Sequence, residues 1–336
     1  MNAGNATIDW LYEEQFRVDD EWSIRRPDGF LWWPHRNAQR VEVIGSEAGP
    51  DGNAGYFVRV KTDFIRDVEL SGEALAGIGL LMSTATMSGL VYDRETHLLS
   101  LSSLVRVHEG IRGWMSLLIS VAAMLQVADA HFIASDLSRL LGGEPATSGH
   151  PESGPRPEPD ELAVGFTPLM AEAGQKPSAW TDREFQQAVE QYMQQPPSLL
   201  ATGGGKGLTV EFPYGDNSSL CEMRSDQQHP RIGNGLSLLQ SFPVDSLSAS
   251  DGTRLALELN AEELDRSPSG YGFGSYCFRD GCVLFTSFIP NLVHQDGLLP
   301  NLYFSCVGRA HAMSARLVDD DWSREGSVNL RADLAQ

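Results

Sequence analysis

SYCFRDGCVLFTSFIP, residues 275–290, decides the fold of the second half of the chain. Two runs of alternating apolar residues flank Asp280-Gly281, and Asp-Gly in that setting is the strongest short signal for a two-residue β-hairpin turn. The turn length sets the pairing, because it places Arg279 opposite Cys282. The stretch therefore predicts two antiparallel strands in register.

A long apolar helix is predicted directly after this hairpin. LLPNLYFSCVGRAHAMSARL, residues 298–317, repeats apolar residues at helical spacing, and Pro300 suits the first turn of a helix. The first half has the same arrangement in LVYDRETHLLSLSSLVRV, residues 90–107, followed by GWMSLLISVAAMLQV, residues 113–127. This second helical region runs from 111 to 141, and the sequence leaves open whether it is one helix or two.

Further blocks recur in the same order, about 180–190 residues apart, which predicts an internal duplication. The paired blocks are Phe30–Pro34 with Val210–Pro213, Gly55–Phe64 with Gly233–Phe242, Val68–Leu75 with Leu257–Leu264, and Leu99–Val105 with Val283–Ile289. Each unit should form a helix, an antiparallel sheet with a short helix between its strands, and a final helix.

The domain organisation follows from composition. Residues 144–178 are rich in Pro, Glu, Gly and Ser, a composition that buries little apolar surface, and they predict a linker. We expect one α+β domain over 1–143, a second over 179–325, and a tail over 326–336. Thr181 and Glu184 form a capping box that opens the first helix of the second domain.

The order of elements resembles the type III secretion chaperone fold and its YbjN-like relatives. The resemblance is carried by the two hairpin-plus-helix blocks quoted above, with the acidic charge, and covers both units. It implies an α+β protein with two tandem helix/sheet/helix modules. It also implies protein binding rather than catalysis, commonly with paired modules, in a bacterial secretion, signalling or defence system.

The charge limits the partners that the chain can bind. Its formal net charge of −20 opposes binding to nucleic acid or to an anionic membrane and favours a neutral or basic protein segment. The four cysteines lack metal-site or disulfide spacing, and the N-terminus lacks the pattern of a signal peptide, so a cytoplasmic location is expected. The uncharged run 113–128 is short for a bilayer span and predicts a core helix.

No motif predicts catalysis or a cofactor. Gly203-Gly204-Gly205-Lys206 lacks the spacing and the hydroxyl residue of a phosphate loop, and the eight histidines have no helical metal spacing. His108 and His294 recur between hairpin and final helix, where a role at the start of that helix is expected. We predict no catalytic residue, no metal and no cofactor.

Aromatic residues are the candidate binding surface. Trp32 and Trp33 are adjacent in a predicted strand, so one ring should point away from the core and be covered either by the first helix or by a partner. The predicted partner-binding residues are Trp32, Trp33, Phe212, Phe285 and Phe288.

The sequence therefore favours a non-enzymatic chaperone-like or adaptor-like factor. An intramolecular pair of the two units or a homo-oligomer is compatible with it. The alternatives are an enzyme or ligand-binding protein with a dispersed site, and a structural subunit of a larger complex in which one unit serves for packing. An exposed apolar patch on one unit alone would favour the structural subunit.

Overall fold

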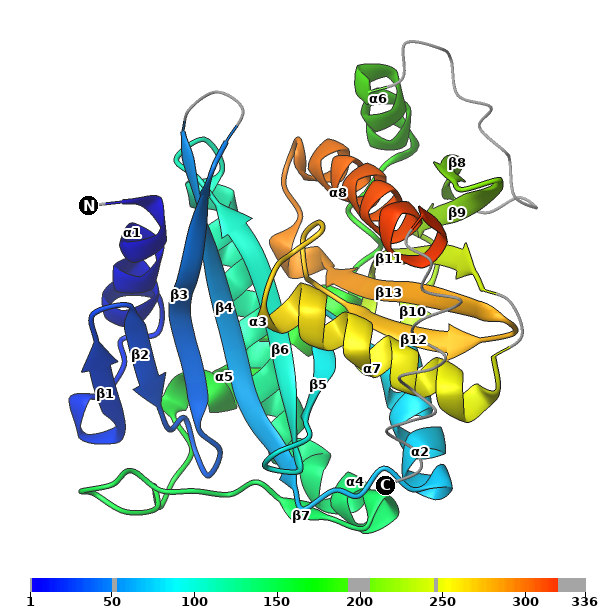
Figure 1. The fold of residues 1–336 in the computed structure, drawn as a ribbon. Coiled ribbons are helices and arrows are strands. Elements are labelled where there is room, and N and C mark those ends of the chain that lie inside the picture. Colours follow the sequence, from blue (N-terminus) through cyan, green and yellow to red (C-terminus); the bar gives the residue numbers. More distant parts are fainter. Residues whose placement is uncertain (1, 50–52, 193–205, 245–246, 320–336) are drawn as a thin grey trace.

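The structure is a computed structural model that describes residues 2–49, 53–192, 206–244 and 247–319. It is an α+β fold with two antiparallel sheets and helices packed on them (Figure 1). The first part comprises α1 (Ala3–Asp9), the short helices Trp10–Gln15 and Asp20–Trp22, β1 (Ser23–Arg26), β2 (Gly29–Trp32), β3 (Gln39–Ala48), β4 (Ala54–Arg66), α2 (Gly72–Ser83), β5 (Gly89–Asp93), β6 (Leu98–Val107), α3 (Arg112–Phe132) and α4 (Ala134–Leu141).

Between the sheets in sequence lie β7 (Glu144–Pro145) and α5 (Glu161–Gln175). The rest comprises α6 (Asp182–Tyr192), β8 (Gly207–Tyr214), β9 (Asn217–Arg224), β10 (Gln228–His229), β11 (Gly233–Pro243), α7 (Ala249–Asp265), β12 (Ser275–Arg279), β13 (Cys282–Pro290), the turn Asn291–Val293, α8 (Leu298–Ser314) and the last turn Ala315–Asp319.

The two sheets have the same strand order. The first runs β1-β2-β3-β4-β6-β5, and the second runs β12-β13-β11-β9-β8, which matches β5-β6-β4-β3-β2 strand for strand. All these pairs are antiparallel. The blocks Gly55–Phe64 and Gly233–Phe242 lie in the matching strands β4 and β11, as their similarity predicts.

Local signals in the second unit are confirmed. Arg279 pairs with Cys282, and Asp280 and Gly281 have the positive φ values of 54° and 75° that the turn needs. Thr181 and Glu184 form the capping box, since the Thr181 amide donates to the Glu184 carboxylate at 2.8 Å.

The structure answers one question about helices that the sequence left open and corrects one expected match. The helical region after β6 is two helices, with a break at Ile133. The block 257–264 lies inside α7 and does not match the start of α2; instead Ser248 caps α7 as Ser71 caps α2. The sequence match failed because the shared Glu-Leu pair precedes α2 as Glu69-Leu70 but lies inside α7 as Glu258-Leu259.

The segment 144–178 is ordered, which corrects the linker prediction. β7 pairs with β4, and α5 contacts α3 of the first unit and β11 of the second. Phe166 and Met170, one turn apart, are buried in the core that both units share. The flanking Pro- and Glu-rich residues hid this apolar face, since composition averages over the whole segment.

A buried ion pair lies in the core of the second unit. Arg309 of α8 donates to Glu263 of α7 at 2.7 Å, and both side chains are almost fully buried, with 1% and 2% exposed. The Tyr276 hydroxyl donates to the same carboxylate at 2.5 Å, and the guanidinium lies 3.5 Å from the Phe285 ring centre. Burial, followed by the nearby carboxylate, raises the pKa of Tyr276 well above its usual value.

We predict that Arg309→Met lowers the free energy of unfolding by about 3–5 kcal/mol, because Glu263 is then a buried charge without its partner. The double variant Arg309→Met/Glu263→Leu should regain most of that loss. Urea denaturation of both variants measures this, and a single variant as stable as the parent would contradict the role assigned to the pair.

Candidate functional site

The two units dock through equivalent positions of their last hairpins. By strand register, Leu104 of β6 corresponds to Phe288 of β13, and Thr86 before β5 corresponds to Gly272 before β12. The Phe288 amide donates to the Thr86 carbonyl at 3.1 Å, and the Gly272 amide donates to the Leu104 carbonyl at 3.0 Å. The same two positions therefore meet twice, although the donor and acceptor positions are exchanged between the two contacts.

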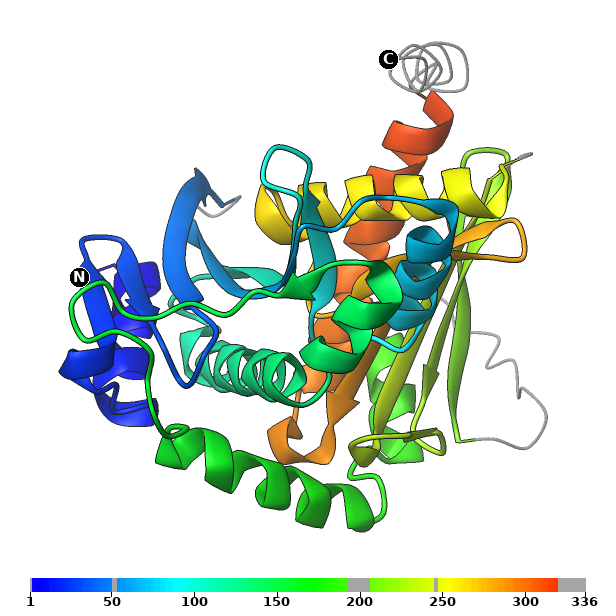
Figure 2. The ribbon, with the colours of Figure 1, turned by 90° about the horizontal axis from the view of Figure 1, so that it is seen from below.

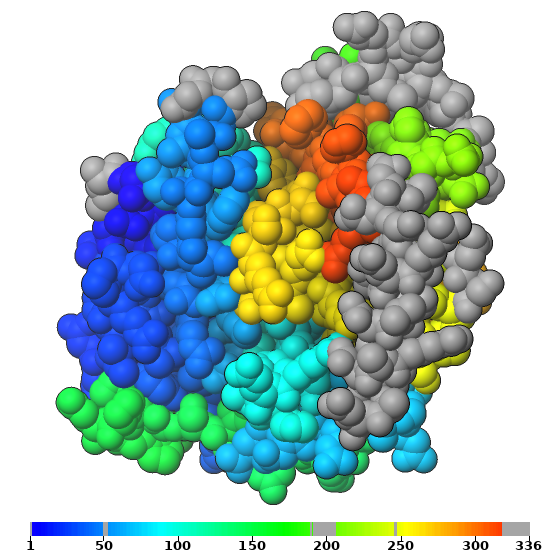
Figure 3. All heavy atoms as spheres, viewed as in Figure 1, coloured from blue at the N-terminus to red at the C-terminus, as the bar shows by residue number. Residues whose placement is uncertain are grey.

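The helix of each unit that precedes its last hairpin packs on the sheet of the other. α7 contacts β5 and β6, and α2 contacts β12. In the space-filling view, α7 lies directly against the first unit (Figure 3). α2 and α7 also contact each other, so α2 is in contact with elements of both units.

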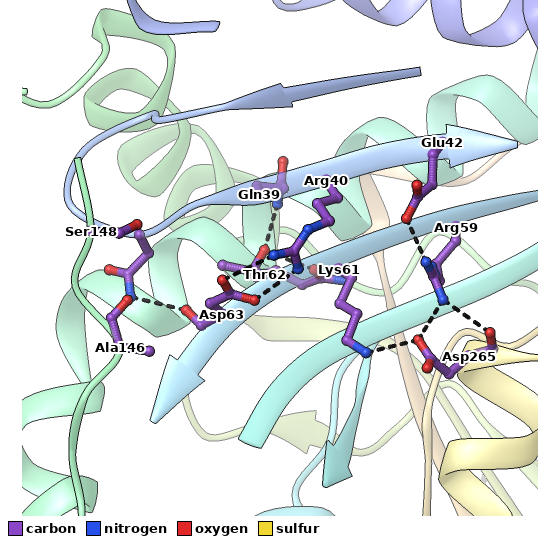
Figure 4. Close-up of polar contacts among 12 residues, drawn as sticks. Gln39, Arg40, Glu42, Arg59, Lys61, Thr62, Asp63, Ala146, Ser148 and Asp265 are labelled. Atoms are coloured by element: carbon purple, nitrogen blue, oxygen red, sulfur yellow. Dashed lines mark hydrogen bonds and ion pairs between the residues drawn. The ribbon is translucent and has the colours of Figure 1, made fainter. Parts of the chain in front are cut away.

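Charges fix α7 on the outer face of the first sheet (Figure 4). The Asp265 carboxylate accepts hydrogen bonds from Arg59 at 2.8 Å and from Lys61 at 3.0 Å, and Arg59 also donates to Glu42 at 2.5 Å. All four side chains are mostly buried. The Glu42 and Asp265 carboxylates are paired within the chain, although Arg59 Nε is buried without a hydrogen-bond partner among the described residues. We assign this charged cluster to docking between the units.

A hairpin of the second unit reaches the first beside α2. The His229 ring lies 3.2 Å from the Thr84 carbonyl through Nε2, and Arg231 forms an ion pair with Asp129 of α3. Burial lowers the pKa of His229 from 6.5 to about 4, although the Thr84 carbonyl acts in the opposite direction. Burial also raises the pKa of Asp129, outweighing Arg231.

His229 makes folding sensitive to acid. The folded protein keeps this ring neutral down to a pH of about 4, whereas the unfolded chain protonates near 6.5. The unfolded state therefore binds more protons below pH 6.5, and we predict that stability attributable to His229 falls progressively between pH 6.5 and 4, by about 3 kcal/mol in total.

Denaturation curves across this pH range test the effect. His229→Gln should show a shallower decline than the parent, and the control His311→Gln, at an exposed position of α8, should not. Equal slopes for the parent and His229→Gln would contradict the assignment.

The sequence-predicted binding residues lie inside the fold. Trp32, Trp33, Phe212, Phe285 and Phe288 are all buried, with none more than 9% exposed. Trp32 stacks on Phe16 at 5.4 Å, and Phe212 meets Tyr303 edge-on at 5.6 Å. Although these side chains come from both units, they do not form one surface, and none offers an exposed ring to a partner.

Trp33 is the outward-facing ring that the strand pattern predicts, and the segment after β7 covers it. Its indole Nε1 donates to Ser148 at 3.0 Å, and His150 packs edge-on at 5.2 Å. Arg156 donates to the Trp33 carbonyl at 3.2 Å. The cover is a part of the chain, as one alternative required, but it is the segment 148–156 and not the expected first helix.

An exposed apolar surface occurs instead on α2. Its sequence GEALAGIGLLMS carries one charged residue and is apolar all round, a pattern typical of a helix enclosed by protein. Leu75, Ile78 and Met82 are buried, but Ala76 is exposed and Leu80 is 68% exposed. α2 therefore has the composition of a buried helix, but Ala76 and Leu80 on one of its faces are exposed.

α4 extends this stripe. Leu140 lies against Gly77 of α2, where a side chain would leave too little room, and α2 and α4 lie side by side (Figure 2). Leu140 is 57% exposed, and Leu137 on the same helix is half-buried. Ala76, Leu80, Leu137 and Leu140 form what we call the α2–α4 surface.

No group of three or more metal-ligating side chains occurs among residues 2–49, 53–192, 206–244 and 247–319. His294 binds Glu184 at 2.9 Å and thus supports the start of α6, not that of the final helix as expected. This contact and the Thr181 amide lower the pKa of Glu184 against the effect of burial.

One helix has the length and composition to cross a membrane among the described residues. It is α3, and 78% of its most apolar window is buried. Gln126 in its middle donates to Ser103 of β6 at 3.0 Å. These contacts agree with the core helix that the sequence predicts.

Sequence reasoning missed the α2–α4 surface, although a signal existed. The run 74–82 contains no charged or hydrogen-bonding side chain, so a helix over these residues is apolar on every face. Comparisons with protein-family models, curated proteins and solved structures found no match to this chain.

Proposed function

We propose that this protein is a non-enzymatic binding factor, adaptor-like or chaperone-like, which docks a partner protein on the α2–α4 surface. The observation that carries the proposal is the exposed stripe of α2, a helix apolar on every side. Exposed single leucines are ordinary, but here Leu80 and Leu140 stand on two helices that touch, with Leu140 beside Gly77, one turn before Leu80.

Burying these side chains supplies useful binding energy. Fully covering one leucine is worth about 1.5–3 kcal/mol, so Leu80 and Leu140 together can act as central anchors of an interface. Because Gly77 has no side chain, α2 and α4 pack closely there. Leu80 and Leu140 are therefore held on two packed helices. A rigid site loses little entropy when a partner binds.

Charge favours a partner different from a second copy of the chain. Two copies would each carry −20 and repel one another. The exposed Glu73 lies one turn from Ala76 on α2 and adds negative charge beside this surface. A neutral or basic segment with apolar anchors fits this surface best.

The matching strand orders support the further proposal that the chain is a tandem duplication of the YbjN-like, type III secretion chaperone-like kind. In that case the units form an intramolecular pair, and the protein acts in the bacterial cytoplasm within a multi-component secretion, signalling or defence system. The resemblance rests on element order and on the hairpin-plus-helix blocks.

A structural subunit of a larger complex is the second candidate. The α2–α4 surface belongs to the first unit alone, as expected if that unit serves for permanent packing. Such a subunit would keep its partner through extensive washing, whereas an adaptor would exchange it on the time scale of purification.

We predict that Leu80→Asp abolishes capture of the protein's stoichiometric partner from its native host, because a carboxylate would be desolvated at the centre of the contact. Stability should fall by only about 1 kcal/mol: the side chain is exposed, but Asp is a poorer helix former than Leu and would lie at the negative end of α2. Affinity capture with mass spectrometry measures partner recovery.

Leu169→Asp is the matched control, because Leu169 is also exposed but lies on α5. It should retain the partner recovered with the parent. Recovery of the same partner with Leu80→Asp, or no stoichiometric partner with the parent, would count against the proposal.

A further inference from the structure

The turn that carries β10, residues 227–232, lies against the first unit and is only lightly built into its own. β10 pairs with the start of β11 and stands outside the main strand order of the second sheet. Within residues 227–232, His229 and Ile232 are the buried side chains. Detaching this turn therefore exposes little apolar surface and costs much less free energy than unfolding a sheet. We call residues 227–232 the β10 turn.

Both ring nitrogens of His229 are matched to backbone groups. The Arg231 amide donates to Nδ1 at 3.3 Å, and Nε2 lies 3.2 Å from the carbonyl of Thr84, the residue directly after α2. A ring nitrogen that accepts a hydrogen bond carries no proton, so Nε2 carries the one N–H of the neutral ring and donates to Thr84. The ring also packs on Phe288, with centres 5.2 Å apart. The neutral imidazole thus holds the β10 turn on the end of α2.

The protonated ring does not fit the same place. Its second N–H, on Nδ1, would face the Arg231 N–H, so two donors would meet with no acceptor between them. Burial also lowers the pKa of His229 from 6.5 to about 4, because the charged ring would be held away from water. The cation therefore favours a state in which the β10 turn has moved into solvent.

The other charged groups near His229 act in both directions. Arg231, on the same turn, adds to the lowering of the pKa of His229. Asp129 of α3, which pairs with Arg231, acts against it: burial raises the pKa of Asp129, so proton uptake there favours the attached turn. The end of α2 contributes Ser83, Thr84 and Ala85, which do not titrate, and the strands β9 and β12 contribute Glu222, Arg224 and Arg279 to the same cleft.

We propose that His229 is an acid-sensitive latch between the two units. When the ring gains a proton, the β10 turn leaves α2 and α3 while both sheets stay folded. The movement opens a cleft of about 240 Å³ that this turn forms with the end of α2 and the second sheet, and it uncovers Phe288. The latch operates whether or not a partner is docked on the α2–α4 surface.

Amide hydrogen exchange of the full chain, followed by NMR between pH 6.5 and 4, tests the latch. The detached ring titrates near 6.5 and the attached ring near 4, so protection of the Arg231 amide, corrected for the intrinsic rate, should fall by up to about 300-fold. Low concentrations of urea should hardly change this exchange, because a local opening exposes little surface. Amides in the middle of β11, which exchange by unfolding, should respond to urea strongly.

Three variants identify the sensor. His229→Gln can still donate to Thr84 and accept from the Arg231 amide but cannot gain a proton, so protection of Arg231 should be nearly constant with pH. His311→Gln, at an exposed position of α8, is the matched control and should show the fall of the parent. Asp129→Asn should also keep the fall, since it removes only the opposing group.

Constant protection of the Arg231 amide in the parent, or the same fall in His229→Gln, would overturn the latch. Loss of the fall in Asp129→Asn would do so too, because the sensor would then be Asp129. A urea response of Arg231 equal to that of β11 would mean that the turn opens only when the whole fold does. The ring resonances of His229 in the parent give an independent check, since titration near 6.5 would show a ring that is not held.

Discussion

Mutual docking of the two last hairpins is the constraint on which the rest of the structure depends. The amide and carbonyl contacts of Thr86 with Phe288 and of Leu104 with Gly272 bring the edge strands β5 and β12 together. Edge strands that face each other in this way are protected from pairing with other chains. Each helix that precedes those strands must then lie on the neighbouring sheet.

This constraint explains why the packed faces of α2 are apolar. α2 contacts β5 of its own sheet, α4, α7 and β12, and Ala74, Leu75, Ile78 and Met82 are buried there; these contacts do not account for the exposed Ala76 and Leu80. α7, in the matching position, is longer and ends in Asp265, which pairs with Arg59 and Lys61. The two helices thus occupy matching positions with different chemistry, since α7 docks through charged side chains and α2 through apolar ones. Of the two, α2 carries the exposed apolar stripe.

Sequence could predict features set by a few neighbouring residues. The Asp280-Gly281 hairpin and the Thr181 capping box depend on local backbone geometry, and both were found where predicted. The cover over Trp33 and the burial of Phe166 depend on residues more than a hundred positions away or in another unit, so composition misjudged that segment. Leu80 is likewise exposed because α4 and α7 pack on other faces of α2. This depends on tertiary packing, which the sequence pattern of α2 alone does not predict.

Amide hydrogen exchange tests most directly whether the α2–α4 surface is the docking site. It should be compared between the free protein and its stoichiometric complex purified from the native host. The account predicts slower exchange in the complex over 72–83 and 134–141, the segments of α2 and α4, with little change over α5. Unchanged exchange in α2 and α4, with new protection elsewhere in the chain, would contradict it.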